Sequence, residues 1–461
     1  MHRTGNAFRW ISLAVLALVA AATPVALSGQ SGMAGMPGMQ GARQDSVPKK
    51  AKADTTAPSM MMTPLDVPMD RMGSGTTWVP DAAPIASAFR RVGGWDFTGH
   101  GFVYAQYIDE AGPRGDKQFG SLNWGMLMAS HALGGGMIQL RTMLSLDALG
   151  VGAGGYPLLL QSGESFHGQP LHDRQHPHDF WMELSALYLR PISKSTAIEL
   201  YGAPSGEPAL GPVAFMHRPS AMDNPLAPIG HHWQDATHIS FGVATVGVFT
   251  HKWKVEGSVF NGREPDDKRW DFDFGTLDSY SGRVTYNPNA NWSLTAGYGR
   301  LKFVDDSMHR FTASILHGTA LGKNGQWATS VIYGGNQHIG APGWAHSVLL
   351  ESEAVLDNRN TAFARLEFVQ KDASDLVLVD SAAAFPAGRI FNVGAVSAGY
   401  IREVARGRGV TLGIGVRGGV NFVPETLAPF YGSRFPVGAS VFLRLRPVHQ
   451  QGAMAGMPGM P

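Results

Sequence analysis

The sequence predicts an all-β protein, a transmembrane antiparallel β-barrel of about 16 strands with long outer loops and disordered, methionine-rich tails. Three observations lead to this fold class. Apolar and polar residues alternate from residue 95 to residue 446, and the connections between the alternating segments are short and long in turn. After the leader, no segment reaches the ~18 consecutive apolar residues that a spanning helix needs.

The chain begins with a segment typical of a secretory signal peptide. A basic start precedes the apolar run of residues 10–22, which is too short to span a bilayer as a helix, and small residues follow it. We therefore expect residues 1–28 to be removed on export. In the whole chain 37 Lys and Arg residues nearly balance 36 Asp and Glu residues, so we expect no nucleic-acid partner. Because the sequence contains no Cys, disulfides and thiolate metal sites are excluded.

Methionine concentrates at the two ends of the mature chain, residues 29–94 and 447–461. The heptapeptide MAGMPGM occurs at 33–39 and again at 454–460, within a composition that does not fold alone. Neutral, soft thioethers suit Cu(I), and flexible spacing lets one segment wrap several sulfur atoms around one ion. The alternative is a plain linker, or a sink for oxidants in which methionine becomes its sulfoxide. The candidate Cu(I) ligands are Met33, Met36, Met39, Met454, Met457 and Met460.

The segment between the tails, residues 95–446, is expected to form the barrel. In residues 292–298, for example, Trp292 and Tyr298 lie on one face of a strand and Ser293 on the other. Short turns are expected near residues 133–136, 191–195, 250–251, 287–290, 322–325, 357–360 and 405–409. Longer loops are expected near residues 108–117, 147–178, 204–236, 262–278, 303–308, 336–346, 371–390 and 422–433.

These turns and loops join an even number of strands, so both tails emerge on the periplasmic side of an outer-membrane barrel. A secreted β-sandwich or β-propeller would show the same alternation. It would not account for so many aromatic strand faces in a chain of which only 16% of residues are charged. We therefore expect a closed barrel in the outer membrane of a Gram-negative-type bacterium, with its tails in the periplasm.

Histidine forms a second constellation, because nine of the 17 His residues lie between positions 167 and 251. In the densest part, HDRQHPHD at 172–179, the proline favours an extended chain, in which His176 and His178 would point to the same side and share one ion. Imidazole accepts Cu(II), Zn(II) and Ni(II). The alternative is a structural network in which the histidines and nearby Asp and Arg residues fold the loops into the barrel mouth. The candidate ligands are His172, His176, His178, His217, His231 and His232.

Four motifs resemble those of a family of bacterial outer-membrane β-barrel proteins. They are HDRQHPHDFW at 172–181, GEPALGPVAFMH at 206–217, GHHWQDATHISFG at 230–242 and GSVFNGREPDDKRWDFDFG at 257–275. This resemblance implies the location and the fold, and it supplies no activity or ligand residues. The methionine-rich leader followed by a barrel also resembles, more weakly, the copper resistance protein B family of outer-membrane proteins.

These observations predict a protein that binds or passes metal ions, most of all copper, as part of metal handling or resistance. The expected partners are outer-membrane lipid, metal ions and periplasmic metal-carrier proteins; no cofactor is required, and a copper ion is the candidate ligand. Two alternatives remain open: a general or solute-specific porin with structural His loops, and a structural barrel without transport. The sequence carries none of the G-x-S-x-G, H-E-x-x-H or P-loop motifs, so we do not expect an enzyme.

Overall fold

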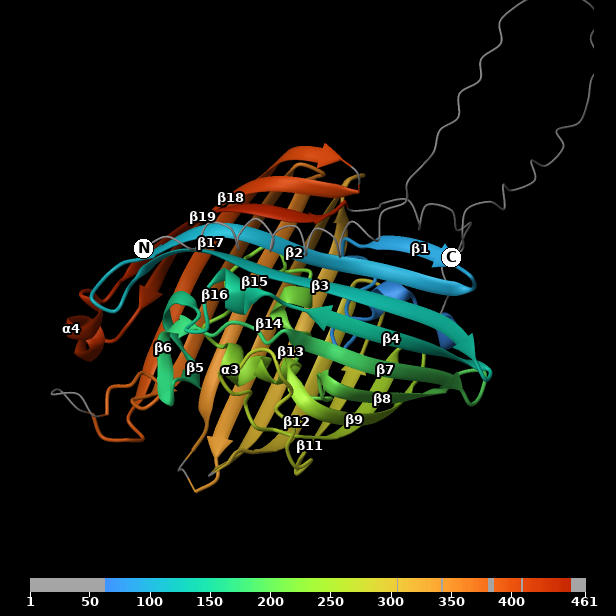
Figure 1. Ribbon diagram of the computed structural model, residues 1–461, viewed down its shortest axis with the longest axis horizontal. Helices are drawn as coiled ribbons and strands as arrows, with labels where there is room; N and C mark the ends of the chain where they lie inside the picture. Colours follow the sequence, from blue (N-terminus) through green and yellow to red (C-terminus); the bar gives the residue numbers. More distant parts are fainter. Residues whose placement is uncertain (1–62, 305, 341–342, 380–384, 408, 449–461) are drawn as a thin grey trace, which may run out of the picture.

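The computed structural model describes residues 63–448 except residues 305, 341–342, 380–384 and 408. Within these residues, sixteen antiparallel strands form one closed sheet, and β19 pairs with β2 to close it (Figure 1). The predicted sixteen-stranded barrel is therefore confirmed. Its strands are β2 (Trp95–Glu110), β3 (Lys117–Leu133), β4 (Gly136–Leu144), β7 (Trp181–Pro191), β8 (Ala197–Gly206), β9 (Ser240–Phe249), β10 (Trp253–Phe260), β11 (Ser279–Tyr286), β12 (Trp292–Lys302), β13 (Ser307–Leu321), β14 (Gly325–His338), β15 (Ala345–Asp357), β16 (Asn360–Asp372), β17 (Ile390–Gly407), β18 (Val410–Phe422) and β19 (Val437–Pro447).

The remaining elements are a short strand that extends the sheet beside β2, a separate two-stranded hairpin and several short helices. They are β1 (Ala88–Val92), the hairpin β5 (Tyr156–Phe166) and β6 (Gln169–Gln175), the helices α2 (Asp147–Gly150), α3 (His231–Gln234) and α4 (Ala428–Tyr431), and the 3-10 helices η1 (Pro64–Asp66), η2 (Met69–Arg71), η3 (Phe215–His217), η4 (Ala236–His238) and η5 (Glu425–Leu427). Strand β1 pairs with the first residues of β2, beyond the point where β19 ends, and the sequence did not predict it. Among the described residues, no helix has the length and apolar character needed to cross a bilayer.

The alternation along each strand separates an apolar outside from a polar inside. In β10, Trp253 and Val255 are about half exposed, whereas Lys254 and Glu256 between them are buried. The same division holds at the closing strand, where Val441 is exposed and Arg444 is buried. This is the reverse of a water-soluble domain, and it is the pattern of a barrel whose outer face meets lipid. The short turns and long loops also alternate as predicted, except that the connection after β12, residues 303–306, is no longer than the short turns.

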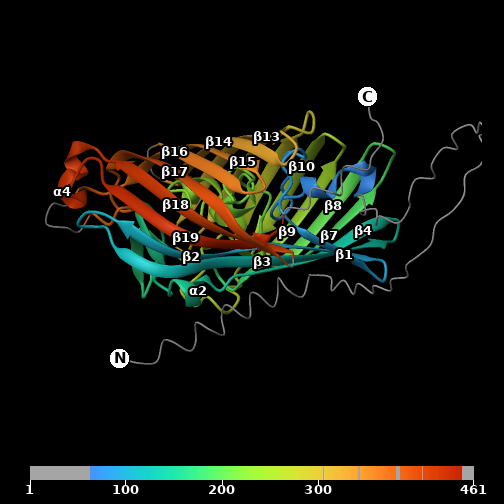
Figure 2. The same ribbon diagram turned by 90° about the horizontal axis from the view of Figure 1, so that it is seen from above.

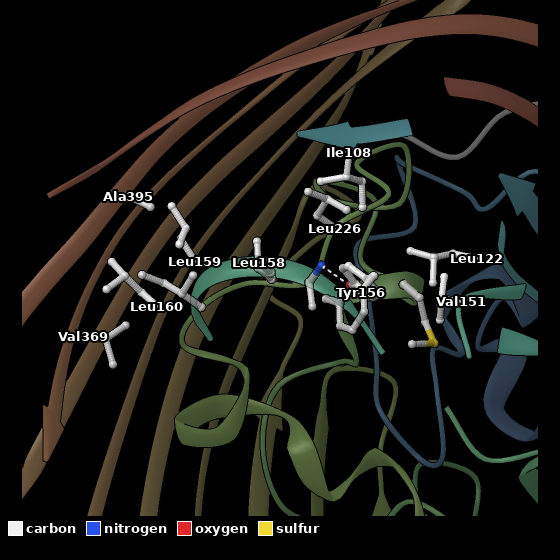
Figure 3. Close-up of a cluster of buried hydrophobic side chains, with 14 of the residues drawn as sticks. Ile108, Leu122, Val151, Tyr156, Leu158, Leu159, Leu160, Leu226, Val369 and Ala395 are labelled. Carbon is white, nitrogen blue, oxygen red and sulfur yellow. Dashed lines mark hydrogen bonds between the residues drawn. The ribbon is translucent and has the colours of Figure 1, made fainter. Parts of the chain in front are cut away.

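The lumen is filled by three segments, residues 63–87, 145–180 and 207–239. Figure 2, which views the barrel at right angles to Figure 1, shows strands β13 to β17 on one wall and β2 and β3 on the other, with chain between them. The hairpin β5–β6 enters this space. Figure 3 shows Leu159 and Leu160 of β5 directed toward the wall residues Val369 and Ala395. The interior is thus packed by the protein's own loops.

The ordered N-terminal segment corrects one prediction. We expected all of residues 29–94 to be disordered, but residues 63–87 lie largely buried in the lumen, near the short turns. Arg71 and Asp81 form a buried ion pair of 2.6 Å, and Thr76 accepts hydrogen bonds from Lys254 and from Arg283 of the barrel wall. A composition that does not fold alone is thus ordered here by charged wall residues. The rest of both predicted tails, residues 29–62 and 449–461, lies outside the described residues.

Candidate metal centre

Two lumenal loops bring five histidines together. Residues 145–180 carry His176 and His178 just after β6, and residues 207–239 carry His231 and His232 on α3 and His238 on η4. Ring centroids are 5.4 Å apart for His176 and His232, 5.2 Å for His231 and His232, and 5.5 Å for His178 and His238. We call these five residues the histidine cluster.

Three members of the histidine cluster have the spacing of metal ligands. One ligating atom each of His176, His231 and His232 lies within 4.8 Å of the others, and all three residues are buried. Zn(II) binds imidazole nitrogen at about 2.0–2.1 Å, so two ligands of one ion lie at most about 4.2 Å apart, and a small movement of these side chains would bring all three onto one ion. His178 and His238 border this group through His231, whose ring lies 5.2 Å from that of His238.

The Nδ1 atoms of the cluster all face hydrogen-bond acceptors. His231 Nδ1 lies 2.6 Å from Asp235 Oδ1, and His178 Nδ1 lies 2.7 Å from Asp147 Oδ2. His232 Nδ1 lies 3.3 Å from Glu264 Oε1, and the Nδ1 atoms of His176 and His238 face backbone carbonyl oxygens at 3.2 and 2.8 Å. A carbonyl oxygen or an ionised carboxylate only accepts, so the proton of each neutral ring belongs on Nδ1.

The Nε2 atoms are consequently the free lone pairs. Among the described residues, none forms a hydrogen bond with the buried Nε2 atom of any of the five rings. Leaving a buried acceptor unsatisfied costs about 1–3 kcal/mol, and this cost recurs in one small volume. A cation bound among these atoms removes it. Histidines that donate Nδ1–H to a carboxylate or carbonyl and present Nε2 are the usual arrangement around a protein-bound metal.

Burial keeps three of the five rings neutral. It lowers the pKa of His231 from 6.5 to about 4, although Asp235 opposes the shift. Burial lowers the pKa of His176 well below 6.5, helped by the positive charge of Arg269, and also lowers that of His238. Asp235 stays ionised, because Arg218 and His231 outweigh burial and lower its pKa below 3.8. At neutral pH His176, His231 and His238 are therefore unprotonated, as metal binding requires.

One carboxylate lies beside the histidine cluster. Glu164 Oε1 of β5 lies 3.2 Å from His176 Nε2, and Arg269 holds the other carboxylate oxygen at 2.5 Å. Burial raises the pKa of Glu164 well above 4.5, with Arg269 opposing it. A cation bound at the three imidazoles would favour the ionised form of this neighbouring carboxylate. Three imidazoles suit Zn(II), Cu(II) or Ni(II).

A glycine makes room for one of the ligands. Gly163 of β5 has φ +123°, a conformation that side chains rarely adopt, and a Cβ atom there would lie 2.3 Å from the His232 ring. The backbone of β5 can approach the ring only because this position is glycine. The hairpin therefore fixes where His232 lies as well as supplying Glu164.

Ion pairs to the wall hold the second loop in place. Arg218, which is fully buried, donates to Asp235 and to Glu351 of β15, each at 2.6 Å. Arg365 of β16 donates to the carbonyl oxygen of Leu226 at 2.8 Å. Because Asp235 also accepts from His231, the chain Glu351–Arg218–Asp235–His231 connects the barrel wall to the cluster.

The structure brings only some of the predicted histidine ligands together. It brings His176, His231 and His232 together, whereas His178 pairs with Asp147 and borders the group. His172 lies apart: its Nδ1 atom is 2.6 Å from Arg114 and 3.0 Å from Asp173. His217 lies against the wall, with Nε2 3.2 Å from the sulfur of Met143. The candidate tail methionines 33, 36, 39, 454, 457 and 460 lie outside the described residues.

Two members of the site were missed by the sequence analysis. His238 was counted with the others but not selected, and Glu164 was not considered, because its partner Arg269 is remote in sequence. The signal for His238 was the motif that holds it, GHHWQDATHISFG, in which Asp235 stands four residues after His231. No local signal marks Glu164.

Comparison with solved structures finds outer-membrane barrels and porins. A loop-deletion form of OmpT, an outer membrane protein of Vibrio cholerae, is 8% identical over 77% of this chain and 99% of its own, with a TM-score of 0.45. The anion-selective porin from Comamonas acidovorans is 11% identical over 76% and 99%, also with a TM-score of 0.45. Salmonella typhi OmpF in complex with daunomycin is 10% identical over 78% and 99%, again with a TM-score of 0.45. No protein-family model and no curated protein sequence matches the chain.

Proposed function

We propose that this protein is an outer-membrane barrel that binds one divalent transition-metal ion inside its filled lumen, at His176, His231 and His232. The observation that carries the proposal is the set of buried Nε2 atoms without hydrogen-bond partners. The exposed apolar outer face supports the location in a membrane. The chemistry of the ligands suits Cu(II), Zn(II) or Ni(II).

Titration calorimetry with Zn(II) and Cu(II) on the full chain in detergent tests the site. Wild type is expected to bind one ion tightly at about pH 7.5, and His231→Asn is expected to lose this binding, since Asn is a poor ligand for these ions. His309→Asn is the matched control, because His309 lies outside the lumen against Tyr298. Equal binding by wild type and His231→Asn would reject the site.

A role in copper handling extends this proposal to the tails. The methionine-rich ends would collect Cu(I) on the periplasmic side and exchange it with periplasmic carrier proteins, as the resemblance to the copper resistance protein B family implies. Replacing Met33, Met36, Met39, Met454, Met457 and Met460 by Leu keeps the apolar volume and removes the sulfur atoms. The number of Cu(I) ions bound per chain is expected to fall by the number that the tails bind. An unchanged Cu(I) stoichiometry would remove the tails from the proposal and leave the lumenal site untouched.

The second candidate function is a general or solute-specific porin. It is favoured by the barrel itself, because sixteen strands is a size at which porins enclose an aqueous channel. Against it stands the filled lumen, with Arg218 and Asp235 both fully buried within it. Conductance across planar bilayers separates the two functions. A lumen closed by its own loops predicts little steady current, whereas a large and constant conductance would favour the porin.

A further inference from the structure

A second group of histidine and methionine side chains lies on the barrel wall, apart from the histidine cluster. The register of the sheet places His100 of β2 opposite Met126 of β3, and Met126 opposite Met143 of β4. All three are buried and face the lumen, since their neighbour Leu127 is exposed on the outer face. Directly opposed residues have Cβ atoms about 4.5–5.5 Å apart, so this row is continuous.

The lumenal loop of residues 207–239 adds a fourth side chain to this group. His217 of η3 lies with its ring centroid 5.3 Å from that of His100 and its Nε2 atom 3.2 Å from the sulfur of Met143. Among the described residues, neither nitrogen of the His100 ring has a hydrogen-bond partner, although the residue is only 6% exposed. A buried imidazole with both nitrogens unsatisfied beside two thioethers has no structural explanation in its own contacts.

From this arrangement we infer that His100, Met126, Met143 and His217 form a second site, which takes a soft monovalent ion, Cu(I) or Ag(I). Two thioethers and two neutral imidazoles are soft or borderline ligands without charge, and such ligands favour Cu(I) over Zn(II).

The surrounding charges point to the same class of ion. Arg141, two residues before Met143 on the same face of β4, is fully buried and pairs with the carboxylate of Glu183 at 3.8 Å. The carboxylate next in the row, Glu183, is already engaged by Ser185 at 2.6 Å and Tyr201 at 3.1 Å. Because Glu183 is engaged by these partners and by Arg141, no free carboxylate remains beside the site, which suits an ion of charge one better than an ion of charge two.

The indole ring of Trp124 packs against both imidazoles of the proposed site. The Trp124 ring lies 4.6 Å from that of His217 and 5.4 Å from that of His100. Water is thereby kept from the ligands, and an ion bound there would lie close to an indole ring. Ag(I), which does not change its oxidation state in air, is the appropriate probe for this site.

The test compares two identical substitutions on one strand of the full chain. Met143→Leu keeps the apolar volume and removes a ligand, so it is expected to bind one equivalent of Ag(I) fewer than wild type. Met137→Leu is the matched control: Met137 is also buried on β4, and it packs in a different cluster. The tails are the same in both variants, so their own Ag(I) cancels. Equal Ag(I) stoichiometry for Met143→Leu and Met137→Leu would overturn the inference.

A measurement on wild type covers the case in which Met143→Leu does not fold. Crystals of the full chain soaked in Ag(I) are expected to show an anomalous peak between His217 Nε2 and Met143 Sδ, and the absence of a peak there would overturn the inference. The result is independent of the proposed divalent site. His231→Asn is expected to lose the divalent ion and keep this Ag(I), so either site can fail without the other.

Discussion

Acidification should destabilise the metal-free protein through the histidine cluster. The folded state keeps His231 neutral, because burial lowers its pKa from 6.5 to about 4. The unfolded chain takes up this proton near pH ~6.5. Between these two values the unfolded state binds more protons than the folded state, so stability falls as the pH falls. The contribution of His231 is fully present above pH ~6.5 and fully lost below pH ~4.

The magnitude follows from the two pKa values. Going from about pH 7 to about pH 5, the contribution of His231 to the free energy of unfolding falls by roughly 2 kcal/mol. His176 and His238 act in the same direction, since burial also lowers their pKa values. Glu164 acts oppositely at the acid end, because burial raises its pKa and the folded state takes up the proton first.

Urea unfolding of the metal-free protein in detergent, followed by the heat-modifiable band on gels, measures this effect. Wild type and His231→Asn share every other titrating group, so the difference between their pH profiles isolates His231. We expect the variant to lose roughly 2 kcal/mol less than wild type between about pH 7 and about pH 5. Parallel profiles for the two proteins would refute a buried, neutral His231.

Three other substitutions probe different parts of the account. Gly163→Ala places a Cβ atom 2.3 Å from the His232 ring, so Zn(II) affinity measured by calorimetry should fall about tenfold or more, and unchanged affinity would show that the ring can shift freely. Arg218→Met leaves Glu351 with one buried partner fewer and should cost about 3 kcal/mol of stability in urea. The same variant should open more often in planar bilayers. An equally stable variant without added conductance would contradict the role of Arg218 in holding the loop to the wall. Val331→Arg on the exposed outer face should cost about 2–4 kcal/mol in lipid if this residue lies near the midplane, whereas no cost would place it outside the membrane.

The barrel was predictable because its signals are local. In each strand the alternation of apolar and polar residues identifies the outer and inner faces, as Trp253 to Glu256 show in β10. Each short turn lies where this alternation is interrupted. A one-residue slip would expose Lys254 to lipid, so the pattern also fixes the register. The number of alternating segments predicts sixteen strands, and an even number of strands is typical of a closed outer-membrane barrel.

The lumen was less predictable because its partners are remote in sequence. Residues 63–87 have a composition that indicates disorder, and they are ordered by Arg141, Lys254 and Arg283, which are far along the chain. Nothing in the segment itself records those partners.

The residues of the proposed metal centre could be selected by type, but their grouping could not be predicted from the sequence. His176, His231 and His232 were all candidates, but the motif HDRQHPHD indicates a shared ion for His176 and His178, because it relates only neighbours in sequence. The two loops meet inside the barrel, where His176 instead faces residues more than fifty positions later. His100 escaped selection because a single histidine on a strand carries no local sign of a site.

The most direct test of the lumenal metal centre is anomalous diffraction at the zinc edge from crystals of the full chain grown with one equivalent of Zn(II). The account predicts one strong peak bounded by the Nε2 atoms of His176, His231 and His232, at about 2.0–2.1 Å from each. A lumen without a peak at these three atoms, in crystals that carry zinc elsewhere, would contradict it.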